Sequence, residues 1–341
     1  MAETKAAVAT AEAKQVEHII SYVEAGIEAL REEMRLNPMI FYIGQGIGPR
    51  GGNWTQTKGL WAEFGEERMK DCPIAELGQT GIGVGAALVG AHPVVDIVFL
   101  DFLLEAMSQI VQQASLIHYV SNGHFKVPLV IRAAWGDIRS AGPHHSHSFY
   151  SYFMHIPGLK VVTPSTPYDV KGLFKTALRD ENPVMFLEHK ALYNSKGPVP
   201  TEEYLLPYGK AAIRREGKDV TVVAVGQMVF RALEAADILA KDGISIEVID
   251  PRTVVPLDRE TILNSIAKTG RVAIADEAYS NCGFSAEIAA MAAEEALDEL
   301  DAPVRRICAL PAPHAFSPSL DSYLQPSTER IVHEITELMK D

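Results

Sequence analysis

One carboxylate, Glu76, stands just before a run of small residues that continues to Ala87. Glycines in this run would let another backbone or a flat ring come close, and the alanines and valine between them keep a helix plausible. A carboxylate at the start of such a helix can accept a hydrogen bond from an N–H group of a nitrogen heterocycle. The spacing alone favours a simpler interpretation, in which Glu76 only interacts with the positive end of the helix dipole.

The segment from Pro143 to Ser148 contains three histidines, His144, His145 and His147. A metal site is one interpretation, but structural zinc sites usually take further ligands from a second spaced pair. A surface segment without a role is another. We favour a histidine that transfers protons or holds a substrate oxyanion near neutral pH, where imidazole titrates.

Phe102 follows an apolar segment, residues 92–99, that is typical of a buried strand. Ligands of open α/β sheets bind at the carboxyl ends of the strands, so Phe102 could stack on a flat heterocycle. Aromatic residues at such positions are more often ordinary core. The sequence has no G-x-x-x-x-G-K-S/T motif, and the glycines at 81, 83 and 85 lack the strand context of a dinucleotide-binding motif.

The elements that must position these residues alternate between helix and strand. We expect a helix over residues 16–36, a strand over 39–43, a glycine-rich loop over 44–53, a long helix over 103–120 and a strand over 128–134. The histidine segment then lies in a polar loop, residues 135–148, at the end of that strand. This rhythm predicts an α/β domain with a mostly parallel sheet.

The length of 341 residues predicts about two domains. We expect a flexible tail over 1–15, an α/β domain over 16–190, a proline-containing linker over 191–210 and a second α/β domain over 211–341. The fold class is therefore α/β, with two doubly wound domains.

Composition excludes several classes of protein. The net charge of −13 disfavours nucleic-acid binding, which needs a basic face, and suits a cytoplasmic protein. No apolar run approaches the roughly 18–20 residues of a membrane span. The three cysteines, Cys72, Cys282 and Cys308, are odd in number and far apart, so they predict neither a disulfide framework nor a zinc site.

Several segments together resemble the β subunit of thiamine-diphosphate-dependent 2-oxo acid dehydrogenases (E1). They are Pro73-Ile-Ala-Glu-Leu-Gly, Asp101-Phe102, His145-Ser-His-Ser, Pro157-Gly-Leu-Lys-Val-Val-Thr-Pro-Ser-Thr-Pro-Tyr-Asp and Val248-Ile-Asp-Pro-Arg-Thr. The resemblance runs in order from about residue 16 to the end of the chain. The segment Phe186–Tyr193 is particularly similar to the pyruvate and acetoin dehydrogenase branches.

The resemblance implies a thiamine-diphosphate pyrimidine-binding domain followed by a transketolase C-terminal-like domain. In the family, the residue matching Glu76 holds N1′ of the aminopyrimidine, the residue matching Phe102 packs on that ring, and the residue matching His145 handles substrate protons and acyl transfer to lipoamide. A structural potassium ion is bound in some members at positions that match Leu129, Ala177, Asp180 and Asn182.

The resemblance also implies partners. In the family a separate α subunit holds magnesium and the diphosphate, so we expect an α2β2 heterotetramer and an inactive isolated chain. The next partner would be a lipoyl-bearing E2 acyltransferase. The expected reaction is decarboxylation of pyruvate or a related 2-oxo acid, or cleavage of acetoin, with transfer of the acyl unit to lipoamide.

Two positions depart from the family pattern. Gln45 stands at the cofactor site where most members have an acid that belongs to a polar channel between the two active centres, and His147 replaces a glutamine. Two alternatives remain open: the C-terminal chain of a split transketolase, or a non-catalytic β-like subunit that only scaffolds an α chain.

Overall fold

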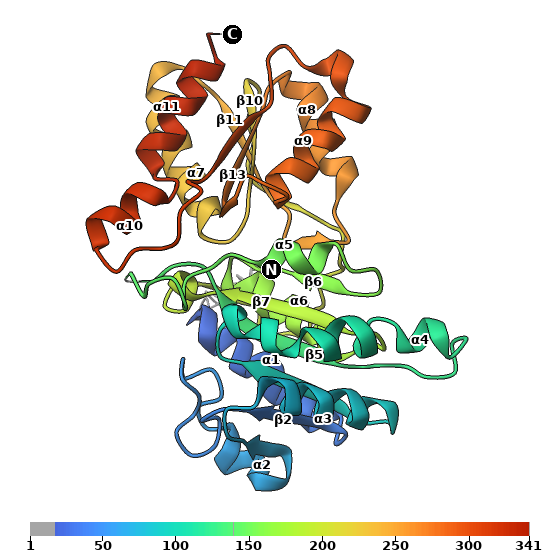
Figure 1. The fold of residues 1–341 in the computed structure, drawn as a ribbon. Helices are drawn as coiled ribbons and strands as arrows, with labels where there is room; N and C mark the ends of the chain where they lie inside the picture. The colour runs from blue at the N-terminus through green and yellow to red at the C-terminus, as the bar shows by residue number, and fades with distance from the viewer. Residues whose placement is uncertain (1–17, 139, 341) are drawn as a thin grey trace, which may run out of the picture.

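The computed structural model describes residues 18–138 and 140–340, and the tail expected over residues 1–15 lies outside this part. Two α/β units lie one above the other in Figure 1, the first in blue to green and the second in yellow to red. The strands are β1 (Ile19–Ser21), β2 (Ile40–Gly44), β3 (Met69–Asp71), β4 (His92–Ile97), β5 (Val130–Trp135), β6 (Lys160–Val162), β7 (Val184–His189), β8 (Lys196–Pro198), β9 (Ala212–Arg215), β10 (Val220–Ala224), β11 (Ile246–Asp250), β12 (Thr253–Val255), β13 (Val272–Tyr279) and β14 (Arg305–Ala309).

The helices alternate with these strands along most of the chain. The α-helices are α1 (Tyr22–Leu36), α2 (Leu60–Arg68), α3 (Glu76–Leu88), α4 (Ile117–Val120), α5 (Tyr150–Met154), α6 (Pro167–Leu178), α7 (Gln227–Leu239), α8 (Arg259–Thr269), α9 (Phe284–Glu295), α10 (Pro318–Leu324) and α11 (Thr328–Leu338). Shorter or non-α helices are η1 (Leu100–Ala106), η2 (Ser108–Ala114), η3 (Lys190–Leu192), η4 (Ala240–Asp242) and η5 (Leu297–Glu299). None of the helices in the described part is long and apolar enough to cross a bilayer.

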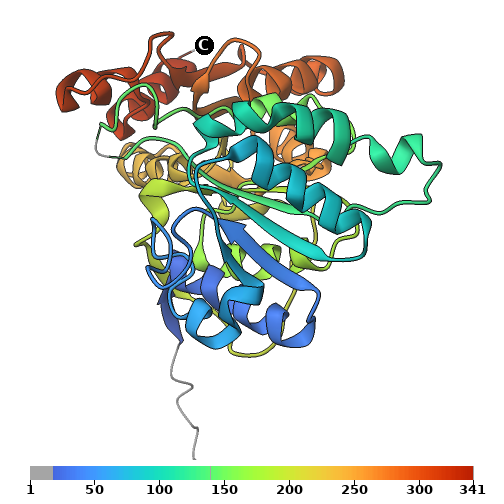
Figure 2. The ribbon, with the colours of Figure 1, turned by 60° about the horizontal axis from the view of Figure 1, so that its bottom comes forward.

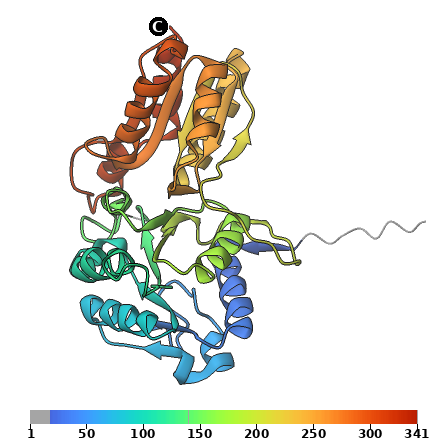
Figure 3. The same cartoon turned by 90° about the vertical axis from the view of Figure 1, so that its right-hand side faces the viewer.

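The sheet of the first unit has seven strands in the order β12-β6-β7-β5-β4-β2-β3. Every neighbouring pair is parallel except β12 with β6. Strands β5 and β7 are buried along their whole length, as is typical of strands covered on both faces. Figure 3 shows α1 and α6 on one face of this sheet and α3 on the other.

The sheet of the second unit has five strands in the order β14-β13-β10-β11-β9, and only β9 is antiparallel to its neighbour. Helices α7 and α11 pack on one face. Helices α8 and α9 pack on the other, in an apolar core that continues into the first unit. The predicted fold class, α/β with two doubly wound units, is confirmed.

The small residues after Glu76 form α3, and they serve two different purposes. A Cβ atom on Gly83 would lie 2.4 Å from Cγ2 of Val95, so only glycine lets α3 approach β4 this closely. A Cβ on Gly85 would meet no atom within 4 Å, because this position faces outward. Gly83 therefore sets the distance between α3 and the sheet, whereas Gly85 lies on the exposed side of the helix.

Two expected helices differ in the structure. The helix expected over 103–120 is instead a 3-10 helix, a π-helix and the short helix α4, which Figure 2 shows extending away from the body. The backbone is closely packed where the π-helix ends, since a Cβ on Gly158 would lie 2.4 Å from the carbonyl oxygen of Ser115. The first helix begins only at Tyr22, because Ser21 and Glu24 form a capping box that ends β1.

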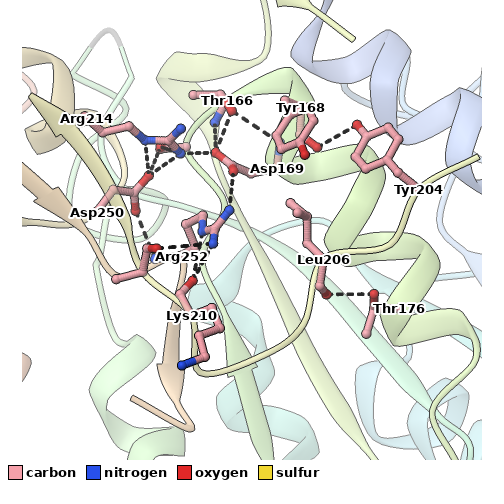
Figure 4. Close-up of polar contacts among 12 residues, drawn as sticks. Thr166, Tyr168, Asp169, Thr176, Tyr204, Leu206, Lys210, Arg214, Asp250 and Arg252 are labelled. Atoms are coloured by element: carbon pink, nitrogen blue, oxygen red, sulfur yellow. Dashed lines mark hydrogen bonds and ion pairs between the residues drawn. The ribbon is translucent and has the colours of Figure 1, made fainter. Parts of the chain in front are cut away.

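An ion cluster joins the two units (Figure 4). The guanidinium of Arg214, on β9, pairs with Asp169 on α6 of the first unit, and at 2.7 Å with Asp250 on β11. Arg252 Nη1 lies 3.4 Å from Asp169 Oδ1. Both aspartates are fully buried, so each depends on these arginines for its counter-charge.

Buried hydrogen bonds join the units at a second place. The hydroxyl of Tyr150 donates to Asp276 at 2.5 Å, and Nε2 of His189 lies 2.6 Å from Oε2 of Glu277. Strand β12 adds a third connection, because it follows β11 of the second unit but pairs with β6 of the first. The sequence did not predict this crossing strand.

Candidate active site

Glu76 is the first residue of α3, as predicted, and only 8% of it is exposed. The Gln45 Nε2 group donates a 3.0 Å hydrogen bond to its Oε1 atom. The start of the helix is held against β4, because Gln79 Nε2 donates to the carbonyl of Asp96 at 3.0 Å. Glu76 is therefore a positioned, largely desolvated carboxylate, and its hydrogen-bond donor in the described part of the chain is the neutral amide of Gln45.

The loop that carries Gln45 is tied down at its start. Asp71, at the end of β3, accepts hydrogen bonds from the backbone N–H groups of Gly46 at 2.7 Å and Gly48 at 3.3 Å. Farther along, Trp54 Nε1 donates to the carbonyl of Val98 at 3.2 Å. These contacts hold the glycine-rich loop over the ends of β2 and β4.

Phe102 and His145, which are far apart in the sequence, lie together. The ring centroid of His145 is 5.5 Å from that of Phe102 and 4.7 Å from that of Phe99, both in edge-on arrangements. Phe102 itself is only partly buried and packs at the margin of the core. An aromatic face thus stands beside an imidazole, as a site for a flat ring and a proton-transferring group requires.

Lys190 supports the backbone at His145, and sequence reasoning missed it. Its ammonium donates to the His145 carbonyl and lies 5.0 Å from the centre of the Phe99 ring. Burial lowers the pKa of Lys190 to about 8. The segment 186–193 contributes to the family resemblance, yet nothing in its spacing points to this contact.

His147 forms a pair with Asp101, a second residue that the sequence did not single out. Its Nδ1 atom lies 2.6 Å from Asp101 Oδ1, which also accepts from the His147 backbone N–H at 3.2 Å. The imidazole stacks on Phe149, with ring centroids 4.1 Å apart. A carboxylate on Nδ1 fixes the ring and leaves Nε2 for another partner, so a second oriented imidazole stands on the same loop as His145.

All these residues share one topological position. Each follows the carboxyl end of a parallel strand: Gln45 follows β2, Glu76 follows β3, Phe102 follows β4, His145 follows β5 and Lys190 follows β7. The carboxyl ends of parallel strands meet at one edge of a sheet, which is where open α/β sheets bind ligands. In the described part no hydrogen bond joins Glu76 to Phe102 or His145, but α3 packs against η1, the helix of Phe102.

The residues expected at a potassium site lie near the turn between α6 and β7 and the start of β5. They are Leu129, Ala177, Asp180 and Asn182. The Asp180 carboxylate accepts from the backbone of Asn182 at 2.9 Å, and its Oδ2 atom lies 2.8 Å from the ammonium of Lys160. Lys160 therefore already neutralises the one carboxylate of the set, and potassium binding stays a prediction.

Comparison with known proteins identifies the two domains. Residues 19–196 match the transketolase pyrimidine-binding domain, and residues 209–331 match the transketolase C-terminal domain. A split-gene transketolase, solved as an inactive β4 tetramer, has a similar structure, with a TM-score of 0.77, 25% identity and coverage of 94% of this chain and 98% of that one. The transketolase of Leishmania mexicana shares the fold, with a TM-score of 0.69 and 17% identity over 94% of this chain and 46% of that one.

Curated relatives are more similar in sequence. The 2-oxoisovalerate dehydrogenase subunit beta of Bacillus subtilis is 42% identical, over 94% of this chain and 98% of that protein. The beta subunit of acetoin:2,6-dichlorophenolindophenol oxidoreductase from the same organism is 41% identical, over 94% and 97%. The mitochondrial pyruvate dehydrogenase E1 component subunit beta of Dictyostelium discoideum is 41% identical, over 89% and 87%. The chain belongs to the family of β subunits of thiamine-diphosphate-dependent 2-oxo acid dehydrogenases.

Proposed function

We propose that this chain is the β subunit of an E1 dehydrogenase that decarboxylates pyruvate or a related 2-oxo acid, or cleaves acetoin, and transfers the acyl unit to lipoamide. Its relatives are named for three different substrates, 2-oxoisovalerate, acetoin and pyruvate. Membership of the family therefore supports the class of reaction and does not select one substrate. The observation that carries the proposal is the buried Glu76 carboxylate at the head of α3, hydrogen-bonded to Gln45.

The residues present fit the pyrimidine half of thiamine diphosphate. Glu76 would accept a hydrogen bond from a ring N–H of the aminopyrimidine, and Phe102 would offer an apolar face to that ring. When bound, the cofactor supplies the carbanion-stabilising centre that these side chains lack. His145 then holds or donates a proton at the substrate oxygen, and Lys190 and Asp101 position its loop.

The same proposal includes the partners and ions. A separate α subunit would hold magnesium and the diphosphate, because the sequence has no phosphate-binding motif of its own, and would complete an α2β2 heterotetramer. A lipoyl-bearing E2 acyltransferase would take the acyl group. We further propose a cytoplasmic location, a domain connection over residues 191–210 and potassium near Asp180, where Lys160 would have to give way.

Replacement of Glu76 by glutamine tests the catalytic assignment. Glu76→Gln keeps the shape but removes the proton-accepting carboxylate, so kcat of the α-reconstituted heteromer should fall roughly 10²- to 10⁴-fold. The assay measures 2-oxo acid-dependent reduction of an artificial electron acceptor, and fluorescence quenching measures binding of thiamine diphosphate. Glu67→Gln is the matched control, because the Glu67 side chain on α2 is 97% exposed. Undiminished turnover in Glu76→Gln would refute the assignment.

A second candidate function is the C-terminal chain of a split transketolase, which the similarity to the split-gene transketolase structure favours. The two candidates differ in the acceptor. The reconstituted heteromer should acylate lipoamide, whereas a transketolase should transfer a ketol group between sugar phosphates. If only the second reaction occurs, the transketolase reading is correct, and if neither occurs with an intact heteromer, the chain is a scaffold.

A further inference from the structure

Three potential metal ligands meet where the two units face each other. Asp137 follows β5 of the first unit, whereas His314 and Asp321 belong to the segment after β14 and to α10 of the second. One ligand atom from each of the three lies within 4.8 Å of the others. The Nδ1 atom of His314 is 3.0 Å from Oδ1 of Asp321.

The cluster brings two carboxyl groups and one imidazole together in a largely buried position. His314 and Asp321 are 5% and 2% exposed. Arg231 lines the same pocket, and its guanidinium donates to the carbonyl of Pro326 and, at 3.5 Å, to Gln227. Two carboxyl groups therefore face one imidazole, with the charge of Arg231 at the same pocket.

Three polar atoms around the cluster are buried without a hydrogen-bond partner. They are Oδ1 of Asp137, Oγ of Ser146 and Oε1 of Gln325. Ser146 is fully buried, and its hydroxyl lies near enough to the Asp137 carboxyl for a small rotation to join the two. Gln325 is 7% exposed, and its Nε2 atom lies 3.3 Å from Nε2 of His314. Buried polar groups without partners are uncommon in native structures, and a bound ion is one recognised reason for them.

One rotation gives Oε1 of Gln325 the hydrogen-bond partner that it lacks. The oxygen and nitrogen of a glutamine side chain have nearly the same shape. With the Gln325 amide turned over, Oε1 accepts the proton of His314 Nε2. In the neutral imidazole this leaves Nδ1 without a proton, with its lone pair toward Asp321. A cation bound at Nδ1 would take the place of the proton that otherwise joins His314 to Asp321 over 3.0 Å. Metal-binding histidines are oriented in this way by a hydrogen bond from the other ring nitrogen.

We propose that Asp137, His314 and Asp321 bind a divalent transition-metal cation of the zinc class, with Gln325 fixing the tautomer of His314. One imidazole nitrogen and two carboxylate oxygens suit zinc better than magnesium, which prefers oxygen ligands and several retained waters. A pocket of about 460 Å³, lined by Asp137, Asp321 and Gln325, provides an entry path and room for water as a fourth ligand.

The position of the ion would give it a structural effect. It would tie the loop after β5, which also carries His145, to α10 of the other unit. A metal that binds only the folded chain adds its binding free energy to stability. The bound ion would therefore raise the thermal stability of the chain and restrain the histidine loop.

The test measures zinc binding to the full-length chain after treatment with a chelator. Isothermal titration calorimetry should give one zinc per chain, and cobalt should give the d–d absorption of a low-coordinate N/O site. Asp321→Asn should abolish this binding. Gln325→Met should weaken it roughly 10- to 100-fold, as loss of an outer-shell partner does. Circular dichroism and thermal unfolding without metal establish that each variant is folded.

The neighbouring histidine segment requires its own control. His144 is exposed on the same loop, so His144→Ala should leave zinc binding unchanged. The proposal is overturned if the wild-type chain binds no zinc at micromolar concentration, which would leave a shared proton between the two carboxyl groups. It is also overturned if His144→Ala abolishes binding while a folded Asp321→Asn variant retains it.

Discussion

At the scale of single residues, the site contains a charged group whose burial costs desolvation free energy. Lys190 keeps an ammonium in an almost fully buried position, beside the ring of Phe99 and the carbonyl of His145. Burial disfavours its charged form, which is why its pKa falls to about 8. Burying an apolar residue at this position would cost less desolvation free energy than burying an ammonium. We therefore assign Lys190 the role of holding the backbone at His145.

The lysine leaves a signature in the pH dependence of stability. The folded chain releases the Lys190 proton near pH 8, whereas the unfolded chain keeps it to about 10.5. Between these values the unfolded state binds more protons, so stability must rise with pH. The unfolding free energy of the wild type, minus that of Lys190→Met, should increase by about 3 kcal/mol from pH 7 to pH 10.5. Urea denaturation measures both, and parallel pH curves for the two proteins would contradict the buried charge.

The sequence predicted some residues of the site and missed others for a physical reason. Glu76, Phe102 and His145 could be proposed because each follows a strand-like segment or lies in an unusual composition. Asp101 and Lys190 could not, because their roles depend on contacts with His147 and with the His145 backbone. Only the fold brings these segments together.

At the scale of elements, α3 is positioned by the close approach of its backbone to β4. Gly83 lies directly over Val95, and Gln79 ties the first turn to the end of the strand. The approach places Glu76 at the sheet edge where the other site residues lie. The sequence predicted this helix and its start correctly, because the pattern that defines it is local. The π-helix over Ser108–Ala114 was missed, because the apolar spacing of the sequence does not distinguish it from an α-helix.

Two glycines of α3 provide a matched pair of substitutions. Gly83→Ala should lower the free energy of unfolding by about 1–3 kcal/mol, because the new methyl group would overlap the Val95 side chain. Gly85→Ala should raise it by up to about 1 kcal/mol, because alanine favours helix and nothing stands in its way. Urea denaturation of the full chain measures both. Equal effects of the two changes would mean that α3 does not approach β4 as closely as described.

At the scale of the whole molecule, the two units are joined by contacts that no segment predicts alone. Strand β12 leaves the second unit to pair with β6 of the first. Arg214 and Arg252 neutralise two aspartates that come from different units (Figure 4). The loop that carries His145 leads into another contact between the units, because Tyr150, which follows the loop, donates to Asp276 of the second unit. Relative motion of the units would therefore move the candidate active site.

The ion cluster allows this coupling to be measured. Arg214→Met leaves Asp169 and Asp250 buried with too little counter-charge, so the free energy of unfolding should fall by about 3–5 kcal/mol. The neighbouring Arg215 is the control, because it pairs with Asp237, whose side chain is 75% exposed. Arg215→Met should cost less than about 1 kcal/mol. Denaturant unfolding of the two variants gives both values.

The same pair of variants shows whether the junction also acts on the site. If the units hold the histidine loop in place, Arg214→Met should lower kcat of the α-reconstituted heteromer even at temperatures where the variant is fully folded. Arg215→Met should leave kcat unchanged, since its side chain lies at the surface away from the junction. A stable Arg214→Met heteromer with wild-type kcat would show that the junction stabilises the chain without positioning the site. A loss of stability equal to that of Arg215→Met would show that the buried aspartates do not need Arg214.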